Sequence, residues 1–258
     1  MGSGYRNAND WDGVVYYTSY NTQATNQLLA PGQLYSPYIG NFFQNNTIGN
    51  ANGPFYDAAN LLWKINYNTL DFELGRTFKI DKIMTLRPFL GLKAAIINQS
   101  INTGWRGPNT LVSNVPVPIT TFTSATENLS NDFYGIGPSF GLDTTWPIHT
   151  FTQGSLSLIG NFSGALMWGK WRYKDYYQTN GSSSVTVTGD AINGAAPMAR
   201  AVVGFKWLTS LSKADVSASL SYEGQAWFDQ MQFNTLSSGR LNDLMSLQGA
   251  VLDLCVNF

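Results

Sequence analysis

Charged side chains are scarce in this chain of 258 residues. Asp, Glu, Lys and Arg together make up 12% of it, about half of the roughly 25% that is typical of a soluble domain. The formal net charge is −1, so the chain lacks the excess of positive charge that is typical of nucleic-acid-binding proteins. We therefore expect no nucleic-acid partner and no long-range steering of a charged ligand.

Several other features are missing as well. No stretch reaches the roughly 18 consecutive apolar residues of a membrane helix. Cys255 is the only cysteine, so no intrachain disulfide can form. The only histidine is His149, in a short predicted turn, where an exposed polar residue is the commoner role than a catalytic base. Nucleotide-binding loops and Cys/His metal spacings are also absent. We expect no enzyme activity, no cofactor and no metal site.

What the chain does have is a repeated alternation of apolar and polar residues, which is typical of β-strands with two different faces. Eight segments show it: 11–20, 58–77, 84–99, 132–146, 155–171, 197–207, 214–229 and 245–258. In 58–77 the phase changes near Tyr67–Leu70, which predicts a β-bulge or a strand that projects beyond the main sheet. The sequence thus predicts an all-β, up-and-down antiparallel fold of eight strands.

The connections between these segments alternate in length. Long loops are predicted at 21–57, 100–131, 173–195 and 230–244, and short turns at 78–83, 147–153 and 208–213. All the long loops then lie at one end of the sheet. No linker interrupts the pattern, so we expect residues 1–258 to form a single domain.

The two faces of these segments differ in size as well as in polarity. The polar face carries small residues such as Gly137 and Ser219, which suit a crowded interior, while Trp146, Trp168 and Trp207 lie near the ends of the apolar face. Aromatic rings at those positions are typical of the interfacial girdles of an outer-membrane β-barrel, as are short turns at one end and long loops at the other. A soluble barrel with an apolar ligand inside is the alternative.

Several segments, in order, resemble the Legionella-type pore-forming major outer-membrane protein family, which also occurs in chlamydia-like bacteria. They are LRPFLGLKAAIINQ (86–99), YGIGPSFGLDTTW (134–146), SLSLIGNFSGALMWGKW (155–171) and YEGQAWFDQMQF (222–233). The resemblance implies an outer-membrane location, pore formation and about ten strands in the complete protein. It also implies an N-terminal truncation, in which GYR (4–6) is the end of a strand that is mostly absent. Separately, the opening MGSG has neither the basic nor the apolar region of a signal peptide, so we expect none in this chain.

The polar face carries acids and bases on several strands. The lumen charges we expect are Asp71, Glu73, Arg87, Lys93, Asp143, Arg200, Lys206, Asp215, Glu223 and Asp253. Two interpretations stay open: a salt-bridge network that fills a narrow barrel, or a water-filled path whose charges act on ions. Eight strands enclose little more than side chains, and the mixed signs argue against strong ion selectivity.

The last ten residues, GAVLDLCVNF, alternate up to the final ring. Leu252, Leu254, Val256 and Phe258 resemble the signal that the barrel-assembly machinery recognises. Cys255 would then be a small filler on the lumen face. An unpaired edge is a liability for a sheet, so this strand either pairs with 11–20 or leaves an open edge.

The function we expect is passive passage of small solutes or ions through a narrow, mixed-charge lumen. The alternative is a non-conducting surface barrel whose long loops bind a host or phage partner. The loop 21–57 contains Leu28, Leu29, Tyr35, Tyr38, Phe42 and Phe43, and it either folds into the mouth or caps a partner site. Outer-membrane lipid, an extracellular ligand at the long loops and a second copy of the chain are the other partners we consider.

Overall fold

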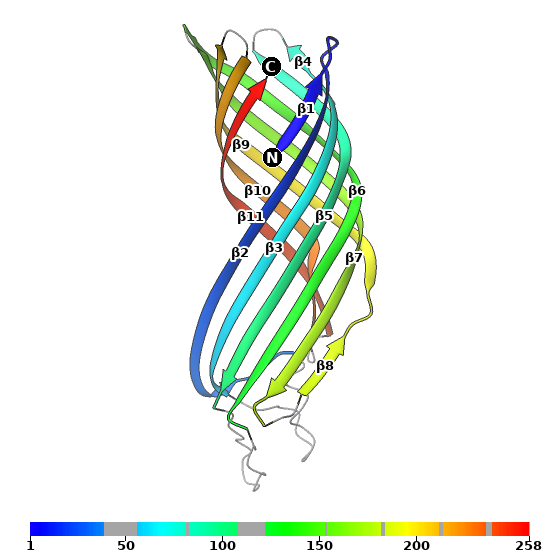
Figure 1. The fold of residues 1–258 in the computed structure, drawn as a ribbon, viewed down its shortest axis with the longest axis vertical. Helices are drawn as coiled ribbons and strands as arrows, with labels where there is room; N and C mark the ends of the chain where they lie inside the picture. Colours follow the sequence, from blue (N-terminus) through cyan, green and yellow to red (C-terminus); the bar gives the residue numbers. More distant parts are fainter. Residues whose placement is uncertain are drawn as a thin grey trace.

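The computed structural model is a single antiparallel sheet (Figure 1). It describes residues 1–38, 56–80, 83–107, 122–152, 154–181, 184–211, 214–235 and 239–257. Within these ranges the strands are β1 (Gly2–Arg6), β2 (Trp11–Leu34), β3 (Tyr56–Arg76), β4 (Phe78–Ile80), β5 (Met84–Arg106), β6 (Ser124–Phe151), β7 (Gly154–Thr179), β8 (Ser184–Thr188), β9 (Ile192–Leu211), β10 (Ala214–Thr235) and β11 (Gly239–Asn257). The described residues contain no helix that is long and apolar enough to cross a bilayer.

Neighbouring strands follow the chain order. The path is β1-β2-β3-β5-β6-β7-β9-β10-β11, with β4 added to β5 and β8 added to β7. Each of the eight predicted segments falls in one of the long strands, but the predicted count of eight is too low, since eleven strands are present in the described residues. The additional strands are short. β4 forms within a predicted turn and β8 within a predicted loop, where each pairs back on the preceding or following long strand.

The long strands run much further than the alternation predicted. β2 continues to Leu34, β6 already begins at Ser124, and β7 continues to Thr179. Large parts of the predicted loops 21–57, 100–131, 173–195 and 230–244 are therefore strand. Figure 1 shows these long strands tilting together along the molecule, with β4 and the C-terminus at one end and β8 toward the other.

The phase change in 58–77 does not produce a bulge. β3 pairs with β2 and β5 without a register shift from Ala58 to Gly75. Instead the strand keeps its direction and its two faces exchange polarity: Ile65 and Tyr67 are buried inside, whereas Leu70 and Phe72 are exposed outside. Neither predicted alternative is therefore observed, because β3 stays paired on both sides within the sheet over this whole length. A register shift does occur in β10, between Trp227 and Met231.

The same exchange divides the whole sheet into two zones. In the belt zone, which holds the short turns, large apolar side chains such as Phe140 on β6 are exposed on the outer face. In the loop-side extension the outer face is polar and the inner face is apolar, as with Phe133, which is fully buried. On β6 the belt zone spans Tyr134 to Trp146. At about 3.3 Å per residue and a tilt of about 45° that is roughly 28 Å, close to the apolar band of about 25 Å in outer-membrane barrels.

The sheet curls but does not close. Side chains of distant strands meet inside it: the Tyr67 hydroxyl on β3 donates a hydrogen bond to Gln225 Oε1 on β10 at 2.9 Å. Within the described residues, however, β11 pairs only with β10. Of the two outcomes predicted for the last strand, the open edge is the one observed. Leu252 and Leu254 are 70% and 76% exposed there, and Phe258 lies outside the described residues.

Candidate functional site in the interior of the sheet

Arg87, on the inner face of β5, is the centre of a charge cluster that joins four strands. Its Nε donates to Asp12 Oδ1 of β2 at 2.8 Å, and its Nη1 donates to Glu73 Oε2 of β3 at 3.0 Å and to Asp143 Oδ2 of β6 at 2.7 Å. The Arg87 side chain is only 13% exposed. The neighbouring Gly75 leaves room for it, because a Cβ there would lie 2.7 Å from Nε of Arg87. The guanidinium thus holds three carboxylates at one point.

Two further ion pairs lie on the inner face. Lys93 and Asp71 are direct partners in the register of β5 and β3, and their side chains form a buried salt bridge. On the opposite side of the interior, Arg200 of β9 binds Glu223 of β10 through two hydrogen bonds of 2.8 and 2.9 Å. Such fork-shaped contacts fix orientation as well as charge.

Hydroxyls and amides add further hydrogen bonds to the carboxylates of these ion pairs. Tyr16 donates to Glu73 at 2.8 Å, and Asn161 donates to Asp143 at 2.5 Å. The amide of Gln225 donates to Glu223 at 2.6 Å. The belt zone therefore encloses a charge network, made of separate hydrogen-bonded groups, rather than an apolar core.

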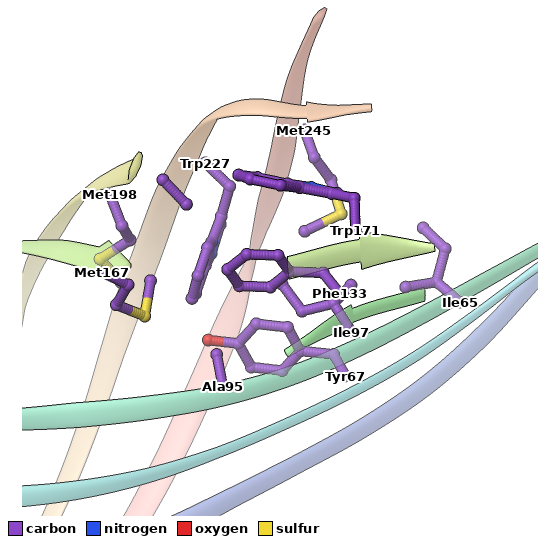
Figure 2. Packing of buried hydrophobic residues seen from close by; sticks show 11 residues of the cluster. Ile65, Tyr67, Ala95, Ile97, Phe133, Met167, Trp171, Met198, Trp227 and Met245 are labelled. Carbon is purple, nitrogen blue, oxygen red and sulfur yellow. The ribbon is translucent and has the colours of Figure 1, made fainter. Parts of the chain in front are cut away.

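An aromatic layer lies on the loop side of this network. Figure 2 shows its side chains packed together. Tyr67 meets the edge of Trp227 at a centroid distance of 5.5 Å, and Phe133 packs on Trp171 at 4.7 Å. Trp227 Nε1 also donates to Gln225 at 3.0 Å, which ties the layer to the charges below it. These rings come from β3, β6, β7 and β10 and together fill the interior at this level.

Several buried amides near the aromatic layer have few partners. The amide nitrogen of Asn131 donates to the backbone oxygen of Gln230 at 3.4 Å. The side-chain oxygen of Asn131 and both amide atoms of Gln99 and Gln230 have no hydrogen-bond partner among the described residues. Buried polar groups are usually satisfied by protein or by ordered water. This part of the interior is thus suited to hold water.

The segment after β2 turns into the mouth of the curled sheet. Ser36 is buried and donates to Glu127 Oε2 of β6 at 2.5 Å. Tyr38 follows and packs on a cluster that includes Leu129. Burial raises the pKa of the Tyr38 hydroxyl, and the charges of Glu127 and Asp175 raise it further. A protonated phenol therefore lies at the mouth.

The loop 21–57 was predicted either to fold into the mouth or to cap a partner site, and the described residues at the end of β2 bear on this choice. Residues 36–38 fold inward, as expected of a constriction. Leu28, Leu29 and Tyr35 are exposed, whereas Phe42 and Phe43 lie outside the described residues.

Comparison with known proteins identifies the family. A family model described as "Legionella pneumophila major outer membrane protein precursor" matches residues 1–258. The chain belongs to this family. It is therefore a protein of the outer membrane, in a family of membrane proteins rather than of enzymes. No curated protein and no solved structure matches the chain.

For this outer-membrane protein, the structure brings together seven of the ten charged residues predicted for the lumen. They are Asp71, Glu73, Arg87, Lys93, Asp143, Arg200 and Glu223. Lys206, Asp215 and Asp253 stand apart, with no ion pair within 4.0 Å among the described residues. Lys206 lies on the inward side of β9, and its register partner is Ser219. Asp215 and Asp253 are exposed near the open edge.

Sequence reasoning missed the strongest partner of Arg87. Asp12 alternates with Trp11 at the start of β2, so its parity alone places it on the polar face. The prediction for Cys255 as a buried filler is wrong: the residue is exposed because β11 is an edge strand. His149 lies within β6 rather than in a turn, and it is exposed and packs on Phe151. No cluster of His, Cys, Asp and Glu that could hold a metal ion occurs in the part of the chain that the structure describes.

Proposed function

We propose that this protein is a narrow pore of the outer membrane, through which small ions and solutes pass passively. The observation that carries the proposal is the inverted polarity of the belt zone. Ion pairs such as Lys93–Asp71 are buried inside it, while Phe140 and Leu92 are exposed outside. This arrangement suits lipid on the outside and water within.

The aromatic side chains support a membrane position for the belt zone. Trp11 and Trp207 are exposed near the short turns, and Tyr17, Tyr134 and Trp168 are exposed near the loop-side limit. Tyr and Trp prefer the two membrane interfaces. We infer that the loop-side extension projects from the cell surface. In the membrane the free edges then meet and close the barrel, since unpaired backbone groups cost several kcal/mol each in hydrocarbon.

The interior allows only a narrow path. The ion pairs around Arg87 occupy the belt zone, and the rings of Tyr67, Phe133 and Trp227 occupy the level above. The under-satisfied amides of Gln99 and Gln230 indicate water beside those rings. We therefore expect a low unitary conductance that depends on the aromatic layer.

Planar-bilayer recording tests this proposal. The pair of variants Phe133→Ala and Phe140→Ala is well matched, because both remove a ring from β6, one inside and one outside. Phe133→Ala should raise the unitary conductance, whereas Phe140→Ala should leave it at the wild-type value. Heat-modifiable migration on gels checks that each protein is folded. Absence of conductance steps from folded wild type and from folded Phe133→Ala would refute the pore.

That same result would favour a non-conducting surface barrel whose loops bind a host or phage partner. One observation supports this second function: the interior of the extension is filled by buried rings such as Phe133 and Trp171. Binding of the purified protein to host cells or phage, lost when the loop 21–57 is shortened beyond residue 38, would test it.

A further inference from the structure

Three basic side chains follow one another on the outer face of β7, directly above the belt zone. Lys170, Arg172 and Lys174 alternate with Trp171 and Tyr173, which are buried inside. Successive cations are therefore about 6.6 Å apart along the strand. Among the described residues, none of the three pairs with a carboxylate within 4.0 Å. Like charges this close repel one another, so the row favours a bound anion.

The outer surface beside this row is hollowed. A groove of about 490 Å³ lies across β2, β3, β5 and β6. Its outward lining includes Lys64, Asn66, Asn98, Ser100, Ser130 and Asp132. Strand pairing places Asp132 opposite Arg172 and Ser130 opposite Lys174, so the groove continues into the basic row. Its amides and hydroxyls are ready hydrogen-bond partners for a polyhydroxylated ligand.

The basic row begins where the apolar outer face ends. Trp168, two residues before Lys170 on the same face, is 66% exposed. Tyr134 is the register partner of Lys170, and the Arg172 guanidinium carbon lies 5.6 Å from the centre of the Tyr134 ring. Because Trp and Tyr settle at the lipid–water boundary, the cations lie at the depth of lipid headgroups.

We propose that the basic row and the groove bind the phosphorylated saccharide headgroup of an outer-leaflet glycolipid. Arg172 and its two lysine neighbours take the phosphates, since guanidinium and ammonium groups bind phosphate strongly. The amides of Asn66 and Asn98 take sugar hydroxyls, and the acyl chains run down the apolar belt. A phospholipid headgroup would use the cations alone and leave the amide-lined groove empty. The inference rests on the proposed function for the depth and orientation of the sheet.

Asp132 is the one acid among the described residues that line the groove, and it faces Arg172 across the pairing of β6 with β7. Burial raises the pKa of the Asp132 carboxyl, and the charge of Arg172 opposes that rise. Together with Lys64 across the groove, the three cations still outnumber it, so the site keeps a net positive charge. An acid in this place also accepts hydrogen bonds from sugar hydroxyls, which a site built for phosphate alone does not need.

The experiment measures lipid binding by the full chain in detergent micelles with native mass spectrometry. The probe is an acylated glucosamine disaccharide with two phosphates, compared with the same lipid after dephosphorylation. The test variant is Lys170→Gln/Arg172→Gln/Lys174→Gln. The control is Arg6→Gln/Arg76→Gln/Lys79→Gln, which removes equal charge from exposed residues at the short-turn end.

We expect the test variant to bind the phosphorylated lipid about tenfold more weakly than wild type, and the control variant to stay within about twofold. Dephosphorylated lipid should bind wild type as weakly as the test variant binds the intact lipid. Equal binding of both lipids, equal binding by the test variant, or displacement of the lipid by millimolar inorganic phosphate would overturn the proposal. A second variant, Asn66→Leu/Asn98→Leu, should weaken lipid binding without any loss of charge.

The same preparations, recorded in planar bilayers free of glycolipid, separate this inference from the pore. Because the three basic side chains face outward, the test variant should conduct as wild type does. If no preparation conducts while lipid binding still follows the cations, the pore fails and the lipid site stands. If the test variant conducts as wild type does and its lipid binding is unchanged, the pore stands and the lipid site fails.

Discussion

Replacing Arg87 by Gln would leave three carboxylates facing one another inside the belt zone. Asp12 and Glu73 have side chains only 6% and 9% exposed, and that of Asp143 is 35% exposed. Removing one partner of a buried ion pair costs about 3–5 kcal/mol, because the other charge stays buried and uncompensated. The partial exposure of Asp143 allows water to screen that carboxylate. We therefore expect Arg87→Gln to lower the free energy of unfolding by about 4 kcal/mol.

Arg200→Gln is the matched control, since Arg200 binds one carboxylate rather than three. Its side chain and that of Glu223 are 24% and 15% exposed, and Gln225 continues to donate to Glu223 in the variant. A loss of about 1–3 kcal/mol is expected. Urea unfolding in lipid vesicles at pH 7, followed by tryptophan fluorescence, measures both variants, and the difference in midpoint at equal slope gives their order.

Asp143→Asn provides a second test of charge repulsion. In the Arg87→Gln background, Asp143→Asn removes one of the repelling charges, so it should recover part of the lost stability. In the wild-type background the same change breaks an ion pair and should destabilise. An Arg87→Gln loss no larger than that of Arg200→Gln, or further destabilisation by Asp143→Asn, would refute the idea that charge repulsion sets the cost.

Three further predictions concern other parts of the interior. Tyr177→Phe removes the buried 2.7 Å hydrogen bond between the hydroxyls of Tyr177 and Tyr56, and it should cost about 1–2 kcal/mol in urea unfolding. Gly75→Ala forces the Arg87 guanidinium to move, and it should cost about 1–3 kcal/mol with little added loss when combined with Arg87→Gln. Because burial and then two nearby carboxylates raise the pKa of Tyr38 above its usual 10.0, its contribution to stability is complete below about pH 10 and is lost at higher pH. Tyr38→Phe should reduce that alkaline loss, measured by unfolding at a series of pH values.

The faces of the belt zone follow directly from the sequence. Alternation places Phe140 outside, and it makes Gly135 and Gly141 inner residues. The reason for these glycines is visible only in the structure. The ring of Phe133 lies over Gly135, and the ring of Phe89 lies over Gly141, so a Cβ at either position would collide with a ring. The sequence therefore indicates that the interior is crowded, but not which side chains crowd it.

Most members of the charge network were predictable, with Asp12 as the exception, but their pairings were not. Parity assigns Arg87 and Glu73 to the polar face. It cannot show that Asp12 and Asp143 converge on the same guanidinium, because that depends on the registers of three strand pairs and on the curl of the sheet. The open edge at β11 depends in the same way on the geometry of the whole sheet.

The loop-side extension was missed because composition outweighed periodicity. Residues 124–133 are rich in Asn, Ser and Thr, which favour loops. The segment nevertheless alternates: Asn128 lies on the outer face, whereas Leu129 and Phe133 are buried. In this segment the apolar residues face inward, whereas in the belt zone they face outward. A pattern that requires one continuous apolar face therefore ends where the two zones meet.

The exchange of faces marks where the surroundings of the sheet change. On β5, Ile96 is the last exposed apolar residue of the outer face, and Asn98 follows it; their register partners on β6 are Tyr134 and Asp132. A one-residue slip would reverse every face, yet these strands pair without a shift through the exchange. The hydrophobic effect therefore acts on one continuous sheet whose apolar side chains face outward in one zone and the protein interior in the other. The proposed pore and the proposed headgroup site both depend on this single level, since it sets the depth of the ion pairs on one face and of the basic row on the other.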